Sequence, residues 1–384
     1  MYLRDDEFMI PGFVDTHTHA AQYANLGVGL QYELLEWLEK VTFPTEASFG
    51  PGESETDHDF IERITEQYTD MVEEYLAAGT TTCCYFGSIQ VAANVILAKV
   101  LMKAGQRAFV GKVCMDCNSP EFYCEGTEES LADTIRFCKV VEEIDSGHGL
   151  VKPIITPRFA ITCSRELMKG LAEVARSQEL NVQTHLSENK GEISFVGDLF
   201  PECKDYTTVY RDMGLLTDKT VLAHAIYLSE DEQQCIIEAG SSLSHCPNSN
   251  FALSSGIMPL KNYLLRGIKV GLGTDVSGGY SLSILDAIRQ AIIGSKALSF
   301  QDGSPELTIE EAFYLATLGG AQALAVDRIT GNFQPAKSFD ALRIKVRKPT
   351  GRGLRADFER FLFTGDDRDV LDTIVQGRVV CSKI

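Results

Sequence analysis

A chain of 384 residues is long enough for one large domain or two ordinary ones, and its 44% hydrophobic and 23% charged residues are typical of a globular protein. The formal net charge of −19 argues against nucleic acid and against an anionic membrane surface as partners, since both favour a basic face. Eleven cysteines scattered through apolar segments indicate reduced thiols, and without a secretory leader or a membrane-length apolar run we expect a cytoplasmic protein. Cys114 and Cys117 have CxxC spacing, but no second pair follows at zinc-site distance, so we interpret them as buried or half-buried thiols.

Eight apolar segments with the character of buried strands alternate with amphipathic segments. The expected strands are residues 13–17, 80–86, 107–114, 151–156, 181–185, 220–224, 241–245 and 268–274. Helices with capping residues are expected to begin near Asp59, Ser164, Ser229 and Thr308. This α/β alternation predicts a TIM-type (β/α)8 barrel of parallel strands over residues 11–333. A doubly wound open sheet is the alternative, weakened because no glycine-rich dinucleotide turn follows the first strand.

Two regions fall outside the alternation. Residues 20–58 form a long excursion after the first strand, and in a barrel they would lie at the mouth of the site. We interpret Trp37, the only tryptophan of the chain, as anchoring a short helix of this excursion to the barrel. Residues 334–384 contain two strand-like segments, and with residues 1–10 they predict a small accessory β unit.

Histidines gather at the ends of the expected strands. His17 and His19 are two residues apart, so in an extended strand their imidazoles face the same side, as a metal ion requires. The positions that share this placement are His17, His19, His185, His224 and Asp275. Barrel enzymes place their sites at the carboxyl ends of the strands, so five converging positions favour a metal site over a polar loop or isolated core histidines. We assign structural places to His58 at a helix start, to His148 in a surface loop and to His245 beside the site.

This pattern resembles the metal-dependent amidohydrolase superfamily, and finer motifs resemble its guanine deaminases over most of the chain. The motifs are residues 11–19 with Gln22, 34–38, 42–44, 157–159, 185–189, 245–247, 271–280 and 365–368. The resemblance implies hydrolytic deamination of guanine to xanthine and ammonia. It also implies one Zn²⁺ per chain with a water or hydroxide as a further ligand, and as protein ligands His17, His19, His185 and Asp275. Neutral imidazoles and one carboxylate suit zinc, although ligand type alone leaves iron or manganese open.

The resemblance also implies catalytic roles for three residues. Glu188 would donate a proton to the purine ring nitrogen while hydroxide attacks the adjacent carbon. Asp275 would accept the proton of the metal-bound water, and His224 would orient the hydroxide. The alternative for Glu188 is a carboxylate that stabilises the start of a helix.

Substrate recognition needs hydrogen-bond donors for a ring carbonyl and an apolar wall. By the same resemblance, Gln22 and Arg158 supply the donors and Phe159 supplies a stacking face. The other residues expected to contact the substrate are His185, Glu188 and Asp275. The alternative for Arg158 is an ion pair with one of the many carboxylates.

Two further hypotheses compete with guanine deamination. One is another amidohydrolase-type deaminase, acting on a pterin, a cytosine or a triazine, and the other is a scaffold that retains the fold without turnover. The resemblance also implies a homodimer. Family members usually carry a longer segment before Pro11 that pairs with the tail in a β-sandwich, so with ten preceding residues we expect a truncated sandwich with exposed sheet edges.

Overall fold

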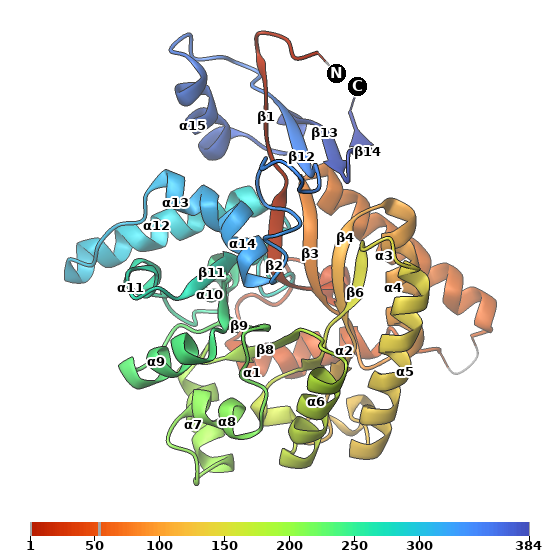
Figure 1. Cartoon of the computed structure of the whole chain (residues 1–384). Coiled ribbons are helices and arrows are strands. Elements are labelled where there is room, and N and C mark those ends of the chain that lie inside the picture. The colour runs from red at the N-terminus through yellow and green to blue at the C-terminus, as the bar shows by residue number, and fades with distance from the viewer. Residues whose placement is uncertain (1, 53–54, 384) are drawn as a thin grey trace.

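The computed structural model describes residues 2–52 and 55–383, and its centre is a ring of parallel strands (Figure 1). The barrel strands are β2 (Phe13–His19), β3 (Thr80–Phe86), β4 (Arg107–Gly111), β6 (Val151–Pro153), β8 (Val182–Leu186), β9 (Thr220–His224), β10 (Ser242–His245) and β11 (Lys269–Leu272). The short strands β5 (Val113–Cys114) and β7 (Thr156–Pro157) continue the third and fourth of these. Strands pair in the orders β2-β3-β4-β6 and β8-β9-β10-β11, and every pairing is parallel.

Backbone contacts join these two sets into a closed ring. A parallel bridge between Ile155 and Val182 links the fourth strand to the fifth. After the last strand, Asp275 N donates to His17 O over 2.9 Å, which links the eighth strand to the first. The predicted (β/α)8 barrel is therefore confirmed, and β2 lies beside the end of the last strand, where the site forms.

Helices surround the ring of strands, and one segment of the barrel is π-helical. The surrounding helices are α3 (Asp57–Ala77), α4 (Val91–Ala104), α5 (Thr127–Asp145), α6 (Arg165–Ser177), α7 (Lys190–Leu199), α8 (Tyr206–Asp212), α9 (Glu230–Ala239), α10 (Pro247–Ala252), α11 (Leu260–Leu265), α12 (Ile284–Asp302), α13 (Ile309–Tyr314), the π-helical η5 (Leu315–Gly319) and α14 (Gly320–Ala323). Two short 3₁₀ turns are η3 (Glu121–Tyr123) and η4 (Ala160–Thr162). Among the described residues, no helix combines the length and apolarity needed to cross a bilayer.

The helix caps agree with the sequence at three of four starts. The side chain of Ser164 caps α6, and Ser229 and Thr308 form full capping boxes at α9 and α13. The fourth expectation is corrected, because α3 begins at Asp57 and the Thr56 hydroxyl, not Asp59, is its cap. Threonine is an accepted capping residue, and the capping-box pattern that begins three residues later, at Asp59, concealed it.

Residues 20–50, which we call the cover segment, fold over the carboxyl ends of the strands. The segment contains η1 (Ala20–Asn25), α1 (Leu34–Trp37), the π-helical η2 (Leu38–Thr42) and α2 (Phe43–Ala47). Single π-helical turns inside α-helices are frequent at functional sites. Trp37 is buried and its Nε1 donates to Val28 O over 3.2 Å, which agrees with the predicted anchoring of a short helix.

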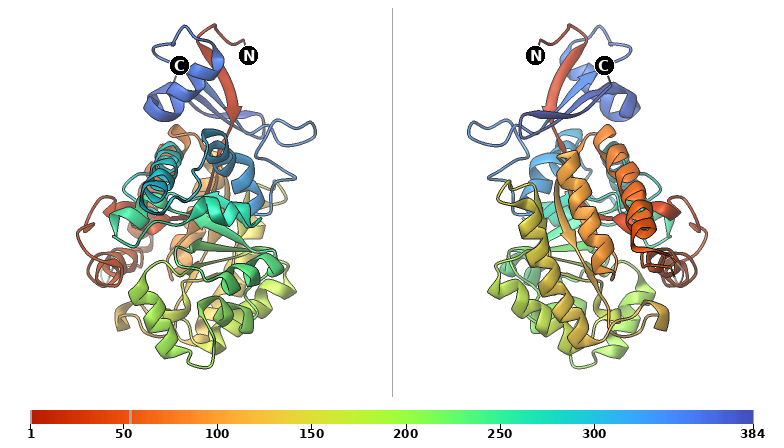
Figure 2. Two further views of the ribbon diagram at one scale, coloured as in Figure 1. Left: turned by 90° about the vertical axis from the view of Figure 1, so that its left-hand side faces the viewer. Right: turned by 90° about the vertical axis from the view of Figure 1, so that its right-hand side faces the viewer.

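The accessory unit is a four-stranded antiparallel sheet at the other end of the barrel (Figure 2). Its strands follow the order β1 (Glu7–Pro11), β12 (Ala341–Lys345), β13 (Val370–Val375) and β14 (Arg378–Ser382), with α15 (Leu354–Thr364) and η6 (Asp367–Asp369) between the second and the third. Residues before Pro11 thus do pair with the tail, and Phe8 packs against Phe358 and Phe361 of α15. Within the described residues the expected sandwich is this one sheet, with β1 and β14 as its edges.

The position of the accessory sheet follows from chain connectivity. Strand β1 runs through Gly12 into the amino end of β2, whereas His17 and His19 lie at the carboxyl end of β2. The sheet and the histidine cluster therefore lie at opposite ends of the barrel. The division into a barrel of residues 11–333 and an accessory unit remains a prediction.

Candidate active site

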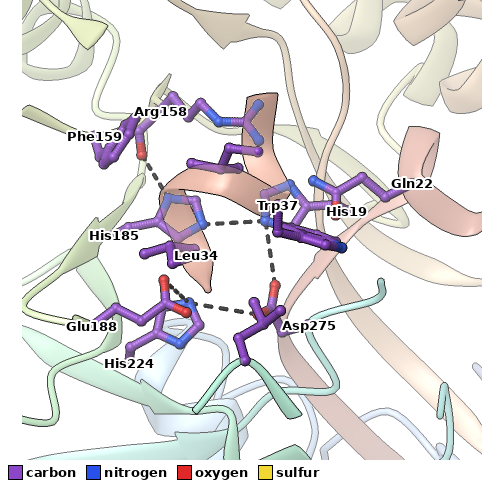
Figure 3. Close-up of a pocket in the computed structure, with 12 residues that line it drawn as sticks. His19, Gln22, Leu34, Trp37, Arg158, Phe159, His185, Glu188, His224 and Asp275 are labelled. Atoms are coloured by element: carbon purple, nitrogen blue, oxygen red, sulfur yellow. Dashed lines mark hydrogen bonds and ion pairs between the residues drawn. The ribbon is translucent and has the colours of Figure 1, made fainter. Parts of the chain in front are cut away.

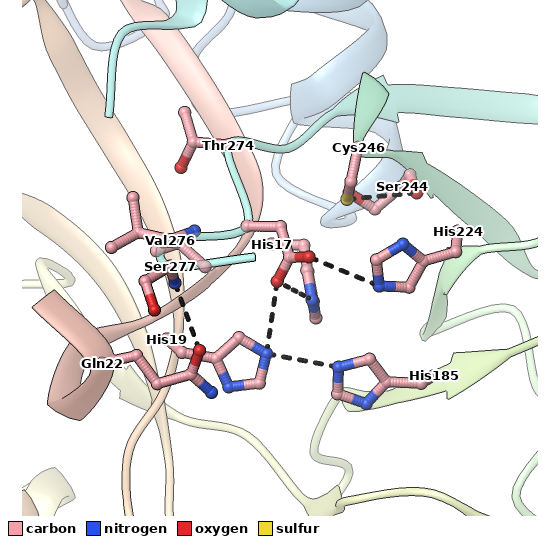
Figure 4. A network of polar contacts seen from close by, with 12 residues as sticks. His17, His19, Gln22, His185, His224, Ser244, Cys246, Thr274, Val276 and Ser277 are labelled. Carbon is pink, nitrogen blue, oxygen red and sulfur yellow. Dashed lines mark hydrogen bonds and ion pairs between the residues drawn. The ribbon is translucent and has the colours of Figure 1, made fainter. Parts of the chain in front are cut away.

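The three expected histidine ligands converge at the carboxyl ends of β2 and β8 (Figure 4), and the fourth expected ligand, Asp275, follows β11 and contacts two of them. His19 Nε2 lies 3.2 Å from His185 Nε2, and Asp275 Oδ1 lies 3.1 Å from His17 Nε2 and 3.4 Å from His19 Nε2. All four side chains are buried. The strand ends therefore direct three imidazole nitrogens and one carboxylate oxygen toward a common point.

The histidines are in the form that binds a metal. His185 Nδ1 lies 2.6 Å from Arg158 O, and because a carbonyl can only accept, Nδ1 donates and Nε2 keeps its lone pair. Burial lowers the pKa of His17, His19 and His185, so all three are neutral near pH 7. His17 Nε2 is a buried nitrogen without a partner of hydrogen-bond geometry. This donor set fits zinc, which takes neutral imidazoles and carboxylates.

Asp275, one of the four expected ligands, also lies close to the other two expected catalytic residues, His224 and Glu188. Its Oδ2 lies 3.6 Å from His224 Nε2, and this same nitrogen lies 3.4 Å from Glu188 Oε2. Burial works to raise the pKa of Asp275, but His17 and the other imidazoles hold that pKa well below its usual range. Burial and the charges of Asp275 and Glu192 raise the pKa of Glu188. The pKa values of the two carboxylates are thus shifted in opposite directions, an arrangement that suits a base and an acid at one pH.

His224 is oriented by a side chain that the sequence analysis did not name. Its Nδ1 lies 2.9 Å from Asn250 Oδ1, an acceptor, so Nδ1 donates and the imidazole is held with Nε2 toward the carboxylates of Glu188 and Asp275. The backbone at the site is also strained. Ser187, His224 and Asp275 have φ values of 48°, 69° and 49°, in the left-handed region that residues other than glycine rarely adopt. Each such residue costs on the order of 1–3 kcal/mol, and such strain clusters at active sites.

A cavity opens beside the cluster (Figure 3). The expected site residues in its wall are His19, Gln22, Arg158, Phe159, His185, Glu188, His224 and Asp275. His17 is absent from this wall and supplies its nitrogen from the cluster behind it. Four apolar wall residues, Leu34, Trp37, Leu38 and Leu253, were not expected to line the site, although the first three lie in the motif at 34–38. Trp37 was expected to have a structural role alone, and its place in the wall adds a second one.

Arg158 and Gln22 meet at a carboxylate that the sequence analysis did not name. Arg158 Nη1 donates to Glu46 Oε2 over 2.6 Å, and Gln22 Nε2 donates to Glu46 Oε1 over 2.7 Å. The alternative interpretation of Arg158, an ion pair, is therefore realised, but the same side chain also lines the cavity. The one local signal of Glu46 was its place two residues after the motif at 42–44.

The remaining singled-out residues lie outside the cavity wall. His58 is exposed at the start of α3, His148 is exposed in a loop, and His245 is buried at the end of β10. Cys114 is buried and Cys117 half-buried, which confirms the interpretation of the CxxC pair as thiols of this kind. Cys246 Sγ lies within 4.8 Å of ligand atoms of His17 and His224 and was not expected there.

Fold and site together define the chain as a parallel barrel with a buried histidine–carboxylate centre, an architecture shared with known hydrolases. The family model of the amidohydrolase family matches residues 8–380. Guanine deaminases from Rattus norvegicus and Homo sapiens are 47% and 45% identical, and each match covers 98% of this chain and 84% of the relative. A crystal structure of guanine deaminase from C. acetobutylicum with bound guanine in the active site superposes with a TM-score of 0.91 at 37% identity, covering 98% of this chain and 87% of the other.

This chain therefore belongs to the amidohydrolase family and, within it, to the guanine deaminases.

Proposed function

We infer that the chain catalyses the hydrolytic deamination of guanine to xanthine and ammonia. One observation carries this inference: a single cavity joins hydrogen-bond donors and an aromatic wall, Gln22, Arg158 and Phe159, to the acid–base pair of Glu188 and Asp275. Relatives named guanine deaminase, with 45–47% identity over nearly the whole chain, support the same substrate.

The residues that would hold one zinc ion are His17, His19, His185 and Asp275. When bound there, zinc lowers the pKa of a water to about 7 and so supplies hydroxide at neutral pH. Support for this assignment comes from the neutral histidines and from the orphaned nitrogen of His17.

The protein's own side chains move the protons. Glu188, whose raised pKa keeps it protonated, donates to the ring nitrogen beside the carbon that carries the amino group. Asp275 Oδ2 takes a proton from the attacking water, and His224 Nε2, held in place by Asn250, orients that water. One C–O bond forms and one C–N bond breaks. Of the two protons of the water, one restores Glu188 and the other leaves with the amino group as ammonia.

Recognition of guanine rests on its ring carbonyl. Arg158 and Gln22 are buried donors at one side of the cavity, and Phe159 supplies a stacking face. Adenine carries an amino group where guanine has the carbonyl, so its binding would leave these buried donors unpaired. Such a mismatch discriminates more strongly than a missing methylene does.

Release of ammonia from a panel of substrates by the zinc-loaded protein tests this function. We expect release with guanine, and at least about 10³-fold less with adenine, cytosine or a pterin. Preferred release from a pterin or a cytosine would favour another amidohydrolase chemistry, and release from none would favour a scaffold. A homodimer and a cytoplasmic location remain predictions.

A further inference from the structure

Glu46 has the surroundings of a functional residue, although it lies outside the cavity wall. It belongs to α2 of the cover segment, and its side chain is fully buried. Both carboxylate oxygens are used. Oε1 accepts from Gln22 Nε2 at 2.7 Å, and Oε2 accepts from Arg158 Nη1 at 2.6 Å and from Tyr123 OH at 2.8 Å.

These bonds hold the two recognition donors in one orientation each. Gln22 Oε1 accepts from Ser277 N over 3.1 Å, so the amide cannot flip and its Nε2 must face Glu46. One N–H of that amide remains for another acceptor. Arg158 gives one of its five N–H donors to Glu46, while the ring of Phe43, also in α2, lies 5.1 Å from the guanidinium carbon.

We propose that Glu46 is the positioning residue for substrate recognition: its carboxylate aims Gln22 and Arg158 together at the ring carbonyl of the purine. This inference rests on the proposed function and adds a residue to it. A buried bridge is suited to this role because donors aimed by fixed partners lose little conformational entropy on binding. It also neutralises Arg158, whose burial without a partner charge would be costly.

Two non-reactive purines separate recognition from chemistry. Hypoxanthine has the ring carbonyl of guanine but lacks the amino group that is removed, and purine lacks both. We would measure Kd for each by calorimetry on the zinc-loaded protein, together with kcat and KM for guanine. The variants are Glu46→Gln and, as matched control, Glu39→Gln, which removes the same charge from an exposed position of the same segment.

The Glu46→Gln variant keeps the size of the side chain but places an N–H where donors now converge. We expect it to weaken the binding of hypoxanthine roughly 10- to 100-fold and the binding of purine less than about threefold. We also expect it to raise KM for guanine by a larger factor than it lowers kcat. In an Arg158→Ala background, Glu46→Gln should add little to the loss of hypoxanthine binding, because the two residues act as one unit. The Glu39→Gln control should bind both purines as the wild type does.

Unchanged hypoxanthine binding in Glu46→Gln would overturn the proposal, and so would an equal loss for both purines, which marks a purely structural role. If Glu46→Gln does not fold, Glu46→Asp keeps the charge but is one methylene shorter. This variant should also lose more affinity for hypoxanthine than for purine. Wild-type binding of both purines would refute the positioning role of Glu46. If Glu46-dependent hypoxanthine binding is found without any ammonia from guanine, the proposed function fails and the positioning role stands.

Discussion

At the scale of single residues, the chemistry depends on keeping two nearby carboxylates in different protonation states. Asp275 lies among imidazoles that stabilise its negative charge, whereas Glu188 is buried near the charges of Asp275 and Glu192, which disfavour ionisation. The two residues occupy the ends of different strands and meet through His224. A pair of groups whose pKa values are pushed apart in this way can act as base and acid at one pH.

Replacing Glu188 with glutamine removes the proton carrier but keeps the size of the side chain. We expect kcat for guanine to fall about 10²- to 10⁴-fold, because general acid catalysis is lost, with zinc content unchanged. Xanthine formation and metal analysis on the same sample check this. Glu230→Gln, at an exposed position of α9, serves as the control. Substantial activity of Glu188→Gln would remove Glu188 from the mechanism.

The buried imidazole of His245 should make the free energy of unfolding depend on pH. Burial lowers its pKa from 6.5 to about 3, so between those values the unfolded chain binds a proton that the folded chain does not. The free energy of unfolding therefore falls as the pH falls through this window, by about 2 kcal/mol between pH 7 and pH 5 from this group. His245→Asn should lose that part of the pH dependence in urea titrations at the two pH values. His58→Asn, at an exposed site, should keep the wild-type dependence, and equal profiles for both variants would contradict the assignment.

Candidate site residues at the strand ends were predictable from sequence, whereas the residues that hold site side chains in position were not. The strand-end histidines stand out because imidazoles are unusual beside apolar strands. Glu46 has no such local signal, since its partners Gln22, Tyr123 and Arg158 are 24, 77 and 112 residues away. Only the folded chain brings these side chains together.

At the scale of elements, the start of α7 connects helix capping to catalysis. Asn189 and Glu192 form a capping box, and Glu192 Oε2 accepts from Asn189 N at 3.1 Å and from Glu188 N at 2.8 Å. The cap therefore also fixes the backbone of Glu188, the proposed proton carrier. Ser229 and Glu232 form the same motif at α9.

Glu192→Ala and Glu232→Ala are a matched pair that separates these two effects. Each should lower the free energy of unfolding by roughly 1–2 kcal/mol, since each removes a buried carboxylate that caps a helix. Only Glu192→Ala should also lower kcat, by about tenfold or more, because Glu188 loses its backbone anchor. Denaturant titration and guanine turnover measure the two quantities. Equal kcat in both variants would show that the α7 cap does not position Glu188.

Element types were predictable because the apolar periodicity and capping residues are local signals. The boundaries of the elements were less predictable. The segment expected as one strand at 107–114 divides into β4 and β5, and the segment at 151–156 is interrupted in the same way before β7. The π-helical η2 of the cover segment depends on packing over the strand ends, which the local sequence does not encode.

At the scale of the whole molecule, the accessory sheet and the candidate site lie at opposite ends of the barrel. The accessory sheet joins β1 to the tail through Arg343, which donates to Glu7 and to Asp372. The barrel was predictable because eight strand–helix alternations leave few topologies. An accessory β unit of residues 1–10 with the tail was also expected, but the register of residues 7–11 against β12 was not, since it joins segments more than 300 residues apart.

Phe8 tests the separation of the two ends. Phe8→Ala removes a buried ring that packs on α15, and we expect a loss of about 3–5 kcal/mol in the free energy of unfolding of the part that contains the sheet. At temperatures where the variant remains folded, kcat and KM for guanine should equal those of the wild type. A large change in kcat of the folded variant would mean that the accessory sheet influences the site.

We propose that a zinc centre built by three histidines and Asp275 deaminates guanine. The most direct test of this claim is a titration of the metal-free protein with zinc while xanthine formation is followed. We predict that activity rises in proportion to bound zinc and reaches its plateau at one zinc per chain. Xanthine formation without metal, or none at one zinc per chain, would contradict the claim.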